Sequence, residues 1–326
     1  MIVLAGDVGG TNARLAIVDV TGRAARIVNE QKYPSKDYPG LAPIVQRFRE
    51  ETKSRPDRAC FGIACPMVGE DCTAPNLPWT INVKKLAAKI EIPRTKIIND
   101  FVAVGYGIEL LAPEDLATLQ EGTVEQHGPI ALIGAGTGLG QGFLFWDDDH
   151  YEVLPSEGGH SDFASRGRVE AGLLQFLEGK FHRVSWERLL SGPGLVNIYH
   201  YLVASRAAPE QRAVRAEMAD EDPAAVIARH GLAKTDALCD RALDLFSEIF
   251  GAQAGNLALT AVATGGVYLA GGIAPKLADR LKEGEFMAAF RDKGRLSELL
   301  ARVPVHVVMN PKVGLLGSAA VAGRMA

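Results

Sequence analysis

Apolar residues along this chain fall into two patterns, short uninterrupted runs and helical periodicities. In the first 110 residues, four short apolar runs predict strands: Ile2–Ala5, Leu15–Val20, Arg58–Ala64 and Lys96–Ile98. Between the second and third runs, apolar side chains recur at the i, i+3, i+4, i+7 spacing of an amphipathic helix, at Leu41, Ile44, Val45 and Phe48. The mixture of strands and helices indicates an α/β protein.

The order strand, glycine-rich turn, strand occurs twice. It first joins Ile2–Ala5 to Leu15–Val20 through GDVGGTN, and it recurs where Pro129–Ile133 is joined to Phe143–Trp146 through GAGTGLGQG. In Rossmann and P-loop proteins a helix follows the glycines, whereas here a strand follows. Each copy is therefore predicted to be a glycine-cornered β-hairpin. We expect two lobes, each opening with such a hairpin, with a cleft between them.

The second half of the chain is predicted to be mostly helical. A long helix is expected over Leu238–Ala263, followed by a strand that paired glycines frame over Gly265–Gly272. Val303–Val308 predicts another strand, and Gly314–Ala326 predicts a terminal helix.

Composition is ordinary for a soluble globular protein. Of the 326 residues, 47% are hydrophobic and 23% charged, and a net charge of −4 provides no basic surface for nucleic acid or an anionic membrane. The uncharged stretch Ile249–Pro275 is long enough to span a bilayer, but its glycines and polar residues favour a buried helix running into a buried strand. Segment 207–236, rich in charges and alanine, suggests a solvated helical excursion.

The chain begins with a strand and shows no basic, apolar leader, so a cytoplasmic protein is expected. Its four cysteines are Cys60, Cys65, Cys72 and Cys239, and they show neither a C-x-x-C spacing nor a partnering set of histidines. We therefore expect reduced thiols, with neither a zinc site nor a disulfide framework.

Three glycine clusters are candidate phosphate-binding elements, because successive backbone N–H groups at a tight turn can hold anionic oxygens. In chain order they are DVGGTN, GAGTGLG and LAGGIAP, the last of which is equally typical of an ordinary turn. The first adds Asp7, which either orients a hydrated Mg²⁺ or stabilises the turn, and Thr11, whose hydroxyl could donate to phosphate. The second adds Thr137 and lacks a P-loop lysine.

Two groups of polar residues are candidates for binding a second substrate. Asn99 and Asp100 follow the strand Lys96–Ile98, at the carboxyl end where α/β folds place their ligands, although Asn-Asp also suits a plain turn. Glu157-Gly158-Gly159-His160 supplies a carboxylate and an imidazole, which can accept the hydroxyl protons of a polyol. The same residues could ligate a metal only with a third ligand, and none is evident, so zinc is not expected.

The order of these elements resembles that of the superfamily of sugar kinases, actin and heat-shock chaperones. More narrowly, the chain is similar to the bacterial glucokinase family over nearly its whole length. The similarity is carried by GDVGGTNARLA (6–16), DYPGL (37–41), IACP (63–66), IINDF (97–101), GAGTGLG (134–140), EGGH (157–160), SGPGLVNIY (191–199), GGVYLAGGIAP (265–275) and NPKVGLLGSA (310–319). Many related kinases carry a cysteine-rich zinc motif after the sugar-binding histidine, but SDFA follows His160 here, which indicates the zinc-free branch.

The resemblance implies an α/β, two-lobed actin-like ATPase fold of the ribonuclease H-like type with a central cleft. Residues 1–110 and 312–326 would form the smaller lobe, and residues 111–311 the larger lobe, which would carry most of the nucleotide site and part of the sugar site. The implied reaction transfers the γ-phosphoryl group of ATP to the C6 hydroxyl of D-glucose with Mg²⁺, and closure of the lobes would expel water. A cytoplasmic homodimer without nucleic-acid or membrane partners is expected.

The resemblance also implies roles for individual residues. Asp100 would be the general base for the C6 hydroxyl. The sugar-binding residues would be Asn76, Asn99, Asp100, Glu157, His160 and Glu187, of which Glu187 alone would otherwise suggest a solvated helix residue. The ATP-binding residues would be Gly6, Asp7, Val8, Gly9, Gly10, Thr11, Gly136, Thr137, Gly138, Gly271 and Gly272, with Asp7 holding Mg²⁺ through water.

The residues leave three alternatives open. The chain could be a kinase for another hexose, such as mannose or an N-acetyl amino sugar. It could be a non-catalytic sugar or nucleotide sensor, although a binding module has no need of a base such as Asp100. A chaperone-like or actin-like ATPase would leave the sugar cluster without a purpose. The phosphoryl donor, ATP or polyphosphate, is likewise open.

Overall fold

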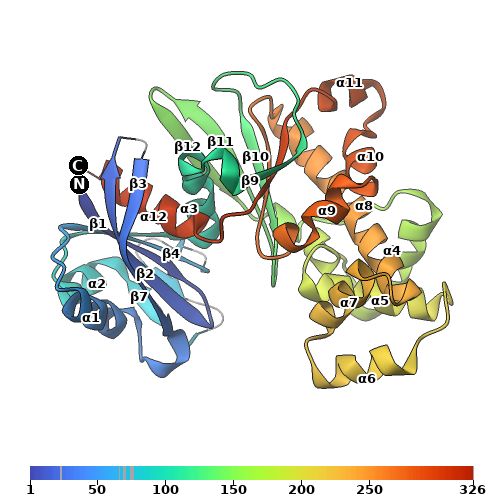
Figure 1. Cartoon of the computed structure of the whole chain (residues 1–326), viewed down its shortest axis with the longest axis horizontal. Helices are drawn as coiled ribbons and strands as arrows, with labels where there is room; N and C mark the ends of the chain where they lie inside the picture. The colour runs from blue at the N-terminus through green and yellow to red at the C-terminus, as the bar shows by residue number, and fades with distance from the viewer. Residues whose placement is uncertain (23, 66, 69–70, 74–76, 326) are drawn as a thin grey trace. The chain divides into compact units, whose positions relative to one another are not determined.

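The computed structural model of the chain describes residues 1–22, 24–65, 67–68, 71–73 and 77–325, and it separates into two compact units (Figure 1). The first unit comprises Met1–Leu116, Trp146–Pro155 and Asn310–Ala326, and the second comprises Ala117–Phe145 and Ser156–Met309. Relative to the division expected from the sequence, the first unit also includes the hairpin segment Trp146–Pro155.

The first unit is built on a five-stranded sheet of order β3-β2-β1-β4-β8. Its strands are β1 (Ile2–Val8), β2 (Asn12–Thr21), β3 (Ala24–Pro34), β4 (Arg58–Ile63) and β8 (Arg94–Asn99). The hairpin of β1 and β2 is antiparallel, whereas β1, β4 and β8 run parallel to one another. Val8 pairs with Ile63, which in turn pairs with Asn99, so the parallel strands end in register at one edge.

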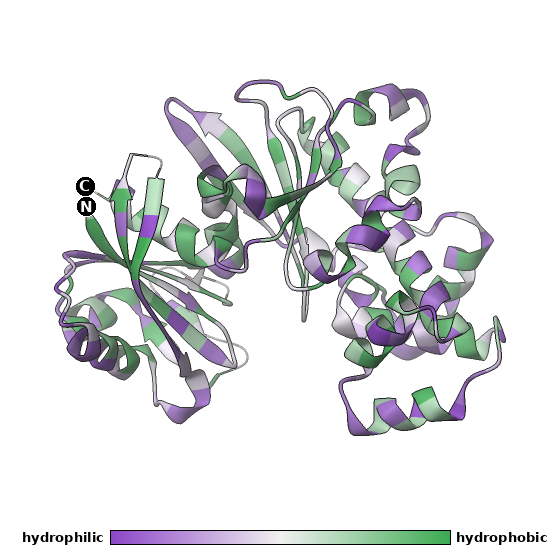
Figure 2. Cartoon of the chain, viewed as in Figure 1, coloured by the Kyte–Doolittle hydropathy of each residue, from purple (hydrophilic) through white to green (hydrophobic). Residues whose placement is uncertain are grey.

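Helices cover both faces of this sheet. One face packs on α1 (Leu41–Thr52) and α2 (Val83–Ile90), and the four apolar positions that predicted the first of these helices are all buried there. The other face packs on α3 (Asp100–Gly107) and α12 (Val313–Arg324). Figure 2 shows the corresponding pattern, with hydrophobic stretches along the strands and hydrophilic outer turns on α1.

Close packing of α3 against α12 depends on glycine. A Cβ atom on Gly317 would collide with the carbonyl oxygen of Ala103, and one on Gly107 would collide with the carbonyl of Val313. The two helices therefore approach backbone to backbone, and α12 holds in place the helix that begins with Asp100.

The strands of the second unit belong to a six-stranded sheet of order β12-β11-β10-β13-β14-β9. The strands of this sheet are β9 (Leu116–Gln120), β10 (Ile130–Ala135), β11 (Leu139–Asp147), β12 (His150–Ser156), β13 (Gly266–Ala270) and β14 (Val305–Val308), of which β12 falls almost entirely within the residues of the first unit. The hairpin of β10 and β11 is antiparallel, and β10 runs parallel to β13. This repeats the relation of β1 to β2 and β4, as the repeated strand, glycine turn and strand predicted.

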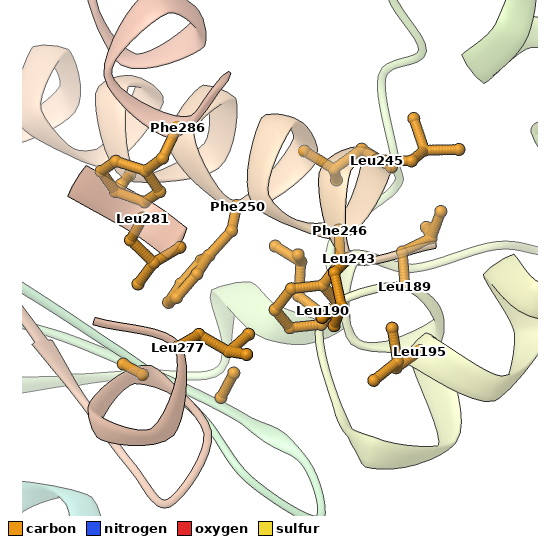
Figure 3. Close-up of a cluster of buried hydrophobic side chains, with 14 of the residues drawn as sticks. Leu189, Leu190, Leu195, Leu243, Leu245, Phe246, Phe250, Leu277, Leu281 and Phe286 are labelled. Atoms are coloured by element: carbon orange, nitrogen blue, oxygen red, sulfur yellow. The ribbon is translucent and has the colours of Figure 1, made fainter. Parts of the chain in front are cut away.

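The helices of the second unit gather around α8 (Ala237–Ala261). The others are α4 (Gly167–Phe181), α5 (Gly192–Ala204), α6 (Arg212–Asp220), α7 (Pro223–Leu232), α9 (Ala278–Lys282), α10 (Glu285–Arg291) and α11 (Ser297–Leu300). Phe250 of α8 meets Phe286 of α10 edge to face with ring centroids 5.6 Å apart, inside the leucine-rich cluster of Figure 3. No helix in the described part of the chain is both long and apolar enough to cross a membrane.

Segment 207–236 is helical, as predicted, but it is not wholly solvated. Val226 and Ile227 of α7 are completely buried and belong to the core that surrounds α8. The helix therefore contributes to the packing of the second unit.

The expectation of four reduced cysteines is wrong. Cys65 and Cys72 form a disulfide, while Cys60 and Cys239 are free and buried. The cause is a small antiparallel sheet of β5 (Met67–Val68), β6 (Asp71–Thr73) and β7 (Thr80–Asn82), which returns the chain and leaves the two Cα atoms 5.8 Å apart. A spacing of this kind has no sequence signature, because the register of the hairpin sets it.

Substitution of Gly317 by alanine is expected to lower the free energy of unfolding by about 1–3 kcal/mol or more, because a methyl group there forces α12 away from α3. Urea unfolding measures the change. Gly179→Ala in α4 is the matched control, since nothing lies within 4 Å of its added methyl group, and it should raise stability by about 0.5–1 kcal/mol. Equal effects of the two substitutions would contradict the packing described here.

Candidate active site

The carboxyl edge of the first sheet brings together the polar residues predicted from two separate motifs. Asp7 is the penultimate residue of β1, Asn99 ends β8, and Asp100 begins α3. Gly62 of β4 lies between them, because it pairs with Asp7 and a Cβ on Gly62 would lie 3.6 Å from the Cα of Asp100. The same Cβ would press on Ala103 at 2.8 Å, so only glycine lets α3 come this close to the sheet.

Asn99 is the N-cap of α3. Its Oδ1 accepts hydrogen bonds from the backbone N–H groups of Phe101 (2.8 Å) and Val102 (3.2 Å), two of the donors that a helix start leaves without partners. The amide oxygen of Asn99 is thus engaged in fixing the first turn of α3. Asp100 Oδ1 accepts from the N–H of Phe101 at 2.9 Å, which orients its carboxylate at the start of the helix.

Asp7 is a partly buried carboxylate with charged neighbours of both signs. Burial raises its pKa above the ordinary value, the adjacent Arg14 opposes this increase, and the negative charge of Asp100 adds to it. Arg14 is the cross-strand partner of Asp7 and is held by the carbonyl oxygen of Pro311 (3.1 Å) and by Glu30 (3.5 Å). Because Gly62 pairs with Asp7 and lies against the Cα of Asp100, the two carboxylates are near each other at this edge.

The glycine turn of the first hairpin is stabilised by Ser35, a residue that the sequence analysis did not single out. Within the turn, Gly9 N–H donates to the carbonyl of Asn12 at 2.9 Å. Ser35, at the start of a short 3₁₀ helix (Ser35–Asp37), is buried and donates its hydroxyl to the carbonyl of Gly9 at 2.8 Å. Its N–H donates to the carbonyl of Thr11 at 2.9 Å, while the Thr11 side chain is exposed.

Ser318 of α12 is a second supporting residue that sequence reasoning missed. It is completely buried and donates its hydroxyl to the carbonyl of Gly6 at 2.9 Å. Its position within the NPKVGLLGSA motif was the available signal, because a serine in an otherwise apolar helix requires a partner.

In the second unit, three predicted elements converge on the β10–β11 hairpin. Gly136 N–H donates to the carbonyl of Gly138 at 2.9 Å and closes the turn. Gly271, with φ of +80°, lies so close to Ala135 that a Cβ would collide with its backbone. Gly159, in a 3₁₀ turn (Gly158–His160), is similarly close to the carbonyl of Leu139. The predicted phosphate, adenosine and sugar elements of this unit are therefore neighbours.

Glu157, His160 and Glu187 form a row of polar side chains beside that hairpin. His160 Nδ1 lies 3.8 Å from Glu187 Oε1, and His160 Nε2 lies 3.9 Å from Glu157 Oε2. Glu187 is not the solvated helix residue that its local sequence suggests. Its side chain is 29% exposed, and its Oε2 accepts a hydrogen bond from the N–H of Leu139 at 3.0 Å. This bond links the row of polar side chains to the glycine turn.

The predicted site residues thus form two groups, one in each unit. The residues from Gly6 to Thr11, together with Asn99 and Asp100, share the edge of the first sheet, and the remaining described residues surround the β10–β11 hairpin. Asn76 lies outside the described residues. Within the described ranges, no group of three or more His, Cys, Asp or Glu side chains converges as a metal site.

Comparison with known proteins bears on this geometry. The family model described as Glucokinase matches residues 4–325. A curated glucokinase of Nostoc sp. is 44% identical over 99% of both chains, and one of Shigella sonnei is 40% identical over 97% of this chain and 95% of the relative. A crystal structure of glucokinase from an Antarctic psychrotroph superposes with a TM-score of 0.88 at 30% identity, covering 99% of each chain.

A more distant solved structure shares the fold. The ROK family glucokinase from Streptomyces griseus, in complex with glucose and AMPPNP, has a TM-score of 0.69 at 20% identity and full coverage of both chains. Together with the two hairpin-based units, these similarities define a sugar kinase with the actin-like ATPase fold. Within that class, the chain belongs to the glucokinase family.

Asp7→Asn is expected to raise the free energy of unfolding near neutral pH. A carboxyl whose pKa is raised by folding contributes stability below the ordinary carboxyl pKa and loses it as the pH rises through the folded value, and an amide escapes that loss. Urea unfolding at about pH 7 and about pH 4.5 should show the larger gain at the higher pH. Asp19→Asn, which removes an ion-paired carboxylate from β2, should give no gain. A loss of stability in Asp7→Asn at both pH values would contradict the assignment.

Proposed function

We propose that this chain is an ATP-dependent glucokinase that transfers the γ-phosphoryl group of ATP to the C6 hydroxyl of D-glucose. The observation that carries the proposal is the position of Asp100. It begins α3 at the carboxyl edge of the first sheet, beside Asp7 and the glycine hairpin, in a chain of the glucokinase family. A general base next to a phosphate-binding turn is what phosphoryl transfer to an alcohol requires.

Asp100 takes the proton from the C6 hydroxyl in this proposal. Its Oδ1 accepts a hydrogen bond from the N–H of Phe101, which fixes the orientation of the carboxylate at the start of α3. As the O–H bond breaks, the C6 oxygen forms its bond to the γ-phosphorus, the bond to the bridging oxygen breaks, and ADP leaves with that electron pair. The Asn99 cap keeps Asp100 aligned throughout, because it fixes the first turn of α3.

Glucose recognition is assigned to hydrogen-bonding side chains of the predicted site residues. Asn99, Glu157, His160 and Glu187 would bind the ring hydroxyls, with Asn76 as a further contact. Glu187 supports this role through its bond to the Leu139 N–H, which fixes one oxygen and leaves Oε1 facing His160. Acceptors fixed in this way discriminate between epimers, because a misplaced hydroxyl leaves them without a donor.

ATP is assigned to the glycine turns. The phosphates would lie on the turn Gly136–Gly138 and on Gly6–Thr11, with adenosine near Gly271 and Gly272, and the S. griseus neighbour in complex with glucose and AMPPNP motivates placing both ligands in such a fold. The carboxylate of Asp7 fits Mg²⁺, which takes oxygen ligands and keeps several waters. When bound, Mg²⁺ would offset charge on the phosphate oxygens. A cytoplasmic homodimer completes the proposal.

Asp100→Asn is expected to reduce kcat for glucose by about 10²–10⁴-fold, with glucose affinity retained, because the amide keeps the shape but accepts no proton. Coupled assays with ATP and glucose, mannose, fructose or N-acetylglucosamine measure both substrate preference and the effect of the variant. Calorimetry measures glucose binding.

Asp220→Asn, on the exposed end of α6, is the control and should leave kcat unchanged. Equal kcat in wild type and Asp100→Asn would contradict the assignment of Asp100 as the general base. Tight glucose binding with no turnover of any sugar would favour a sensor, and a preference for another hexose would assign that sugar instead.

A further inference from the structure

A basic pocket lies in the first unit between the carboxyl ends of α1 and α2, which run side by side (Figure 1). Its volume is about 590 Å³, within the range of small-molecule sites. None of the residues assigned to glucose or ATP lines it. Its cationic residues are Arg49 in the last turn of α1, Lys53 and Arg55 beyond it, and Lys89 in the last turn of α2.

Charge in the pocket is unbalanced. Four cations and two carboxylates, Glu50 and Glu91, line it, so it carries an excess of positive charge in a chain whose net charge is −4. In the described part of the chain none of the four cations forms an ion pair. Apart from Glu50 and Glu91, the nearby acidic side chains are paired with other residues, Glu51 with Arg47 and Asp57 with Arg94.

The floor of the pocket is fixed by hydrogen bonds between the two helices. Gln46 Nε2 donates to the carbonyl of Lys89 at 2.8 Å, and Arg49 Nη1 donates to the carbonyl of Ile90. These donors cover carbonyl oxygens at the end of α2 that would otherwise repel an anion. Arg49 Nε is shielded from solvent and has no partner among the described residues. The guanidinium is therefore held in place before any ligand arrives.

We propose that this pocket binds a small phosphorylated metabolite at a site separate from the catalytic one. Arginine and lysine side chains are the usual partners of phosphate oxygens, arginine through its planar fork and lysine as a point charge. The volume of the pocket suits one small molecule. An excess of positive charge favours a ligand with at least two negative charges, such as a diphosphate or a sugar bisphosphate.

The test is a titration of the full-length protein with inorganic pyrophosphate, followed by amide NMR shifts of residues 49–55 and 89–91. Shifts at these amides report binding at the pocket, whereas binding at the glycine turns would shift other amides. Lys53→Gln with Arg55→Gln should weaken affinity at these amides about tenfold, because two exposed cations are lost. Lys282→Gln with Arg295→Gln removes the same charge from exposed positions of the second unit and should leave affinity unchanged.

The same titration with a hexose bisphosphate distinguishes a sugar phosphate from a diphosphate as the preferred ligand. Glucose phosphorylation without added anion should be equal in both double variants. Arg49 is not substituted, because its hydrogen bond to the carbonyl of Ile90 stabilises the end of α2. If the double variant fails to fold, Arg55→Gln alone is used in its place. Absence of shifts at these amides with either anion, or equal weakening in the control variant, would overturn the proposal.

Discussion

Two carboxylates close together at one edge of a sheet are the constraint on which the first unit depends. Asp7 and Asp100 repel each other, and Asp7 is also partly removed from water, so the fold must compensate both costs. Arg14 supplies the opposite charge from the paired strand, and the N-terminus of α3 receives Asp100. Gly62 and Gly317 make the close approach of α3 possible, one to the sheet and the other to α12. The site is thus held by the packing of the whole unit.

The second unit also contains a hairpin with a glycine-rich turn that other residues must stabilise. As in the first unit, the two strands of the hairpin, β10 and β11, are antiparallel, and β10 runs parallel to the neighbouring strand β13. The turn between β10 and β11 is also glycine-rich. The difference is in what stabilises the turn. In the first unit Ser35 binds the turn through its hydroxyl and N–H, whereas in the second the carboxylate of Glu187 accepts from Leu139. A carboxylate at that position joins the turn to His160, which makes the turn and the sugar cluster one structural element.

Much of this could be predicted from the sequence, because it is encoded by local patterns. The apolar spacing of α1, the two glycine-cornered hairpins and the strand before Asn99 all depend on residues within a few positions of one another. The features that were missed depend on register or on distant contacts. The Cys65–Cys72 disulfide follows from a short hairpin. Glu187 was named through the family resemblance, but the hydrogen bond that holds it comes from an amide almost fifty positions earlier in the chain. Ser35 and Ser318 donate hydrogen bonds to the carbonyl groups of glycines in other elements, and no local sequence pattern predicts these contacts.

In the proposed reaction, Asp100 at the carboxyl edge of the first sheet directs the γ-phosphoryl group of ATP to the C6 oxygen of glucose. The most direct measurement is NMR of the product formed from ATP and ¹³C-labelled glucose by the wild-type protein. A single product whose phosphorus couples to carbon 6 is expected. Phosphorylation at another carbon would contradict it, and so would release of inorganic phosphate without any sugar phosphate.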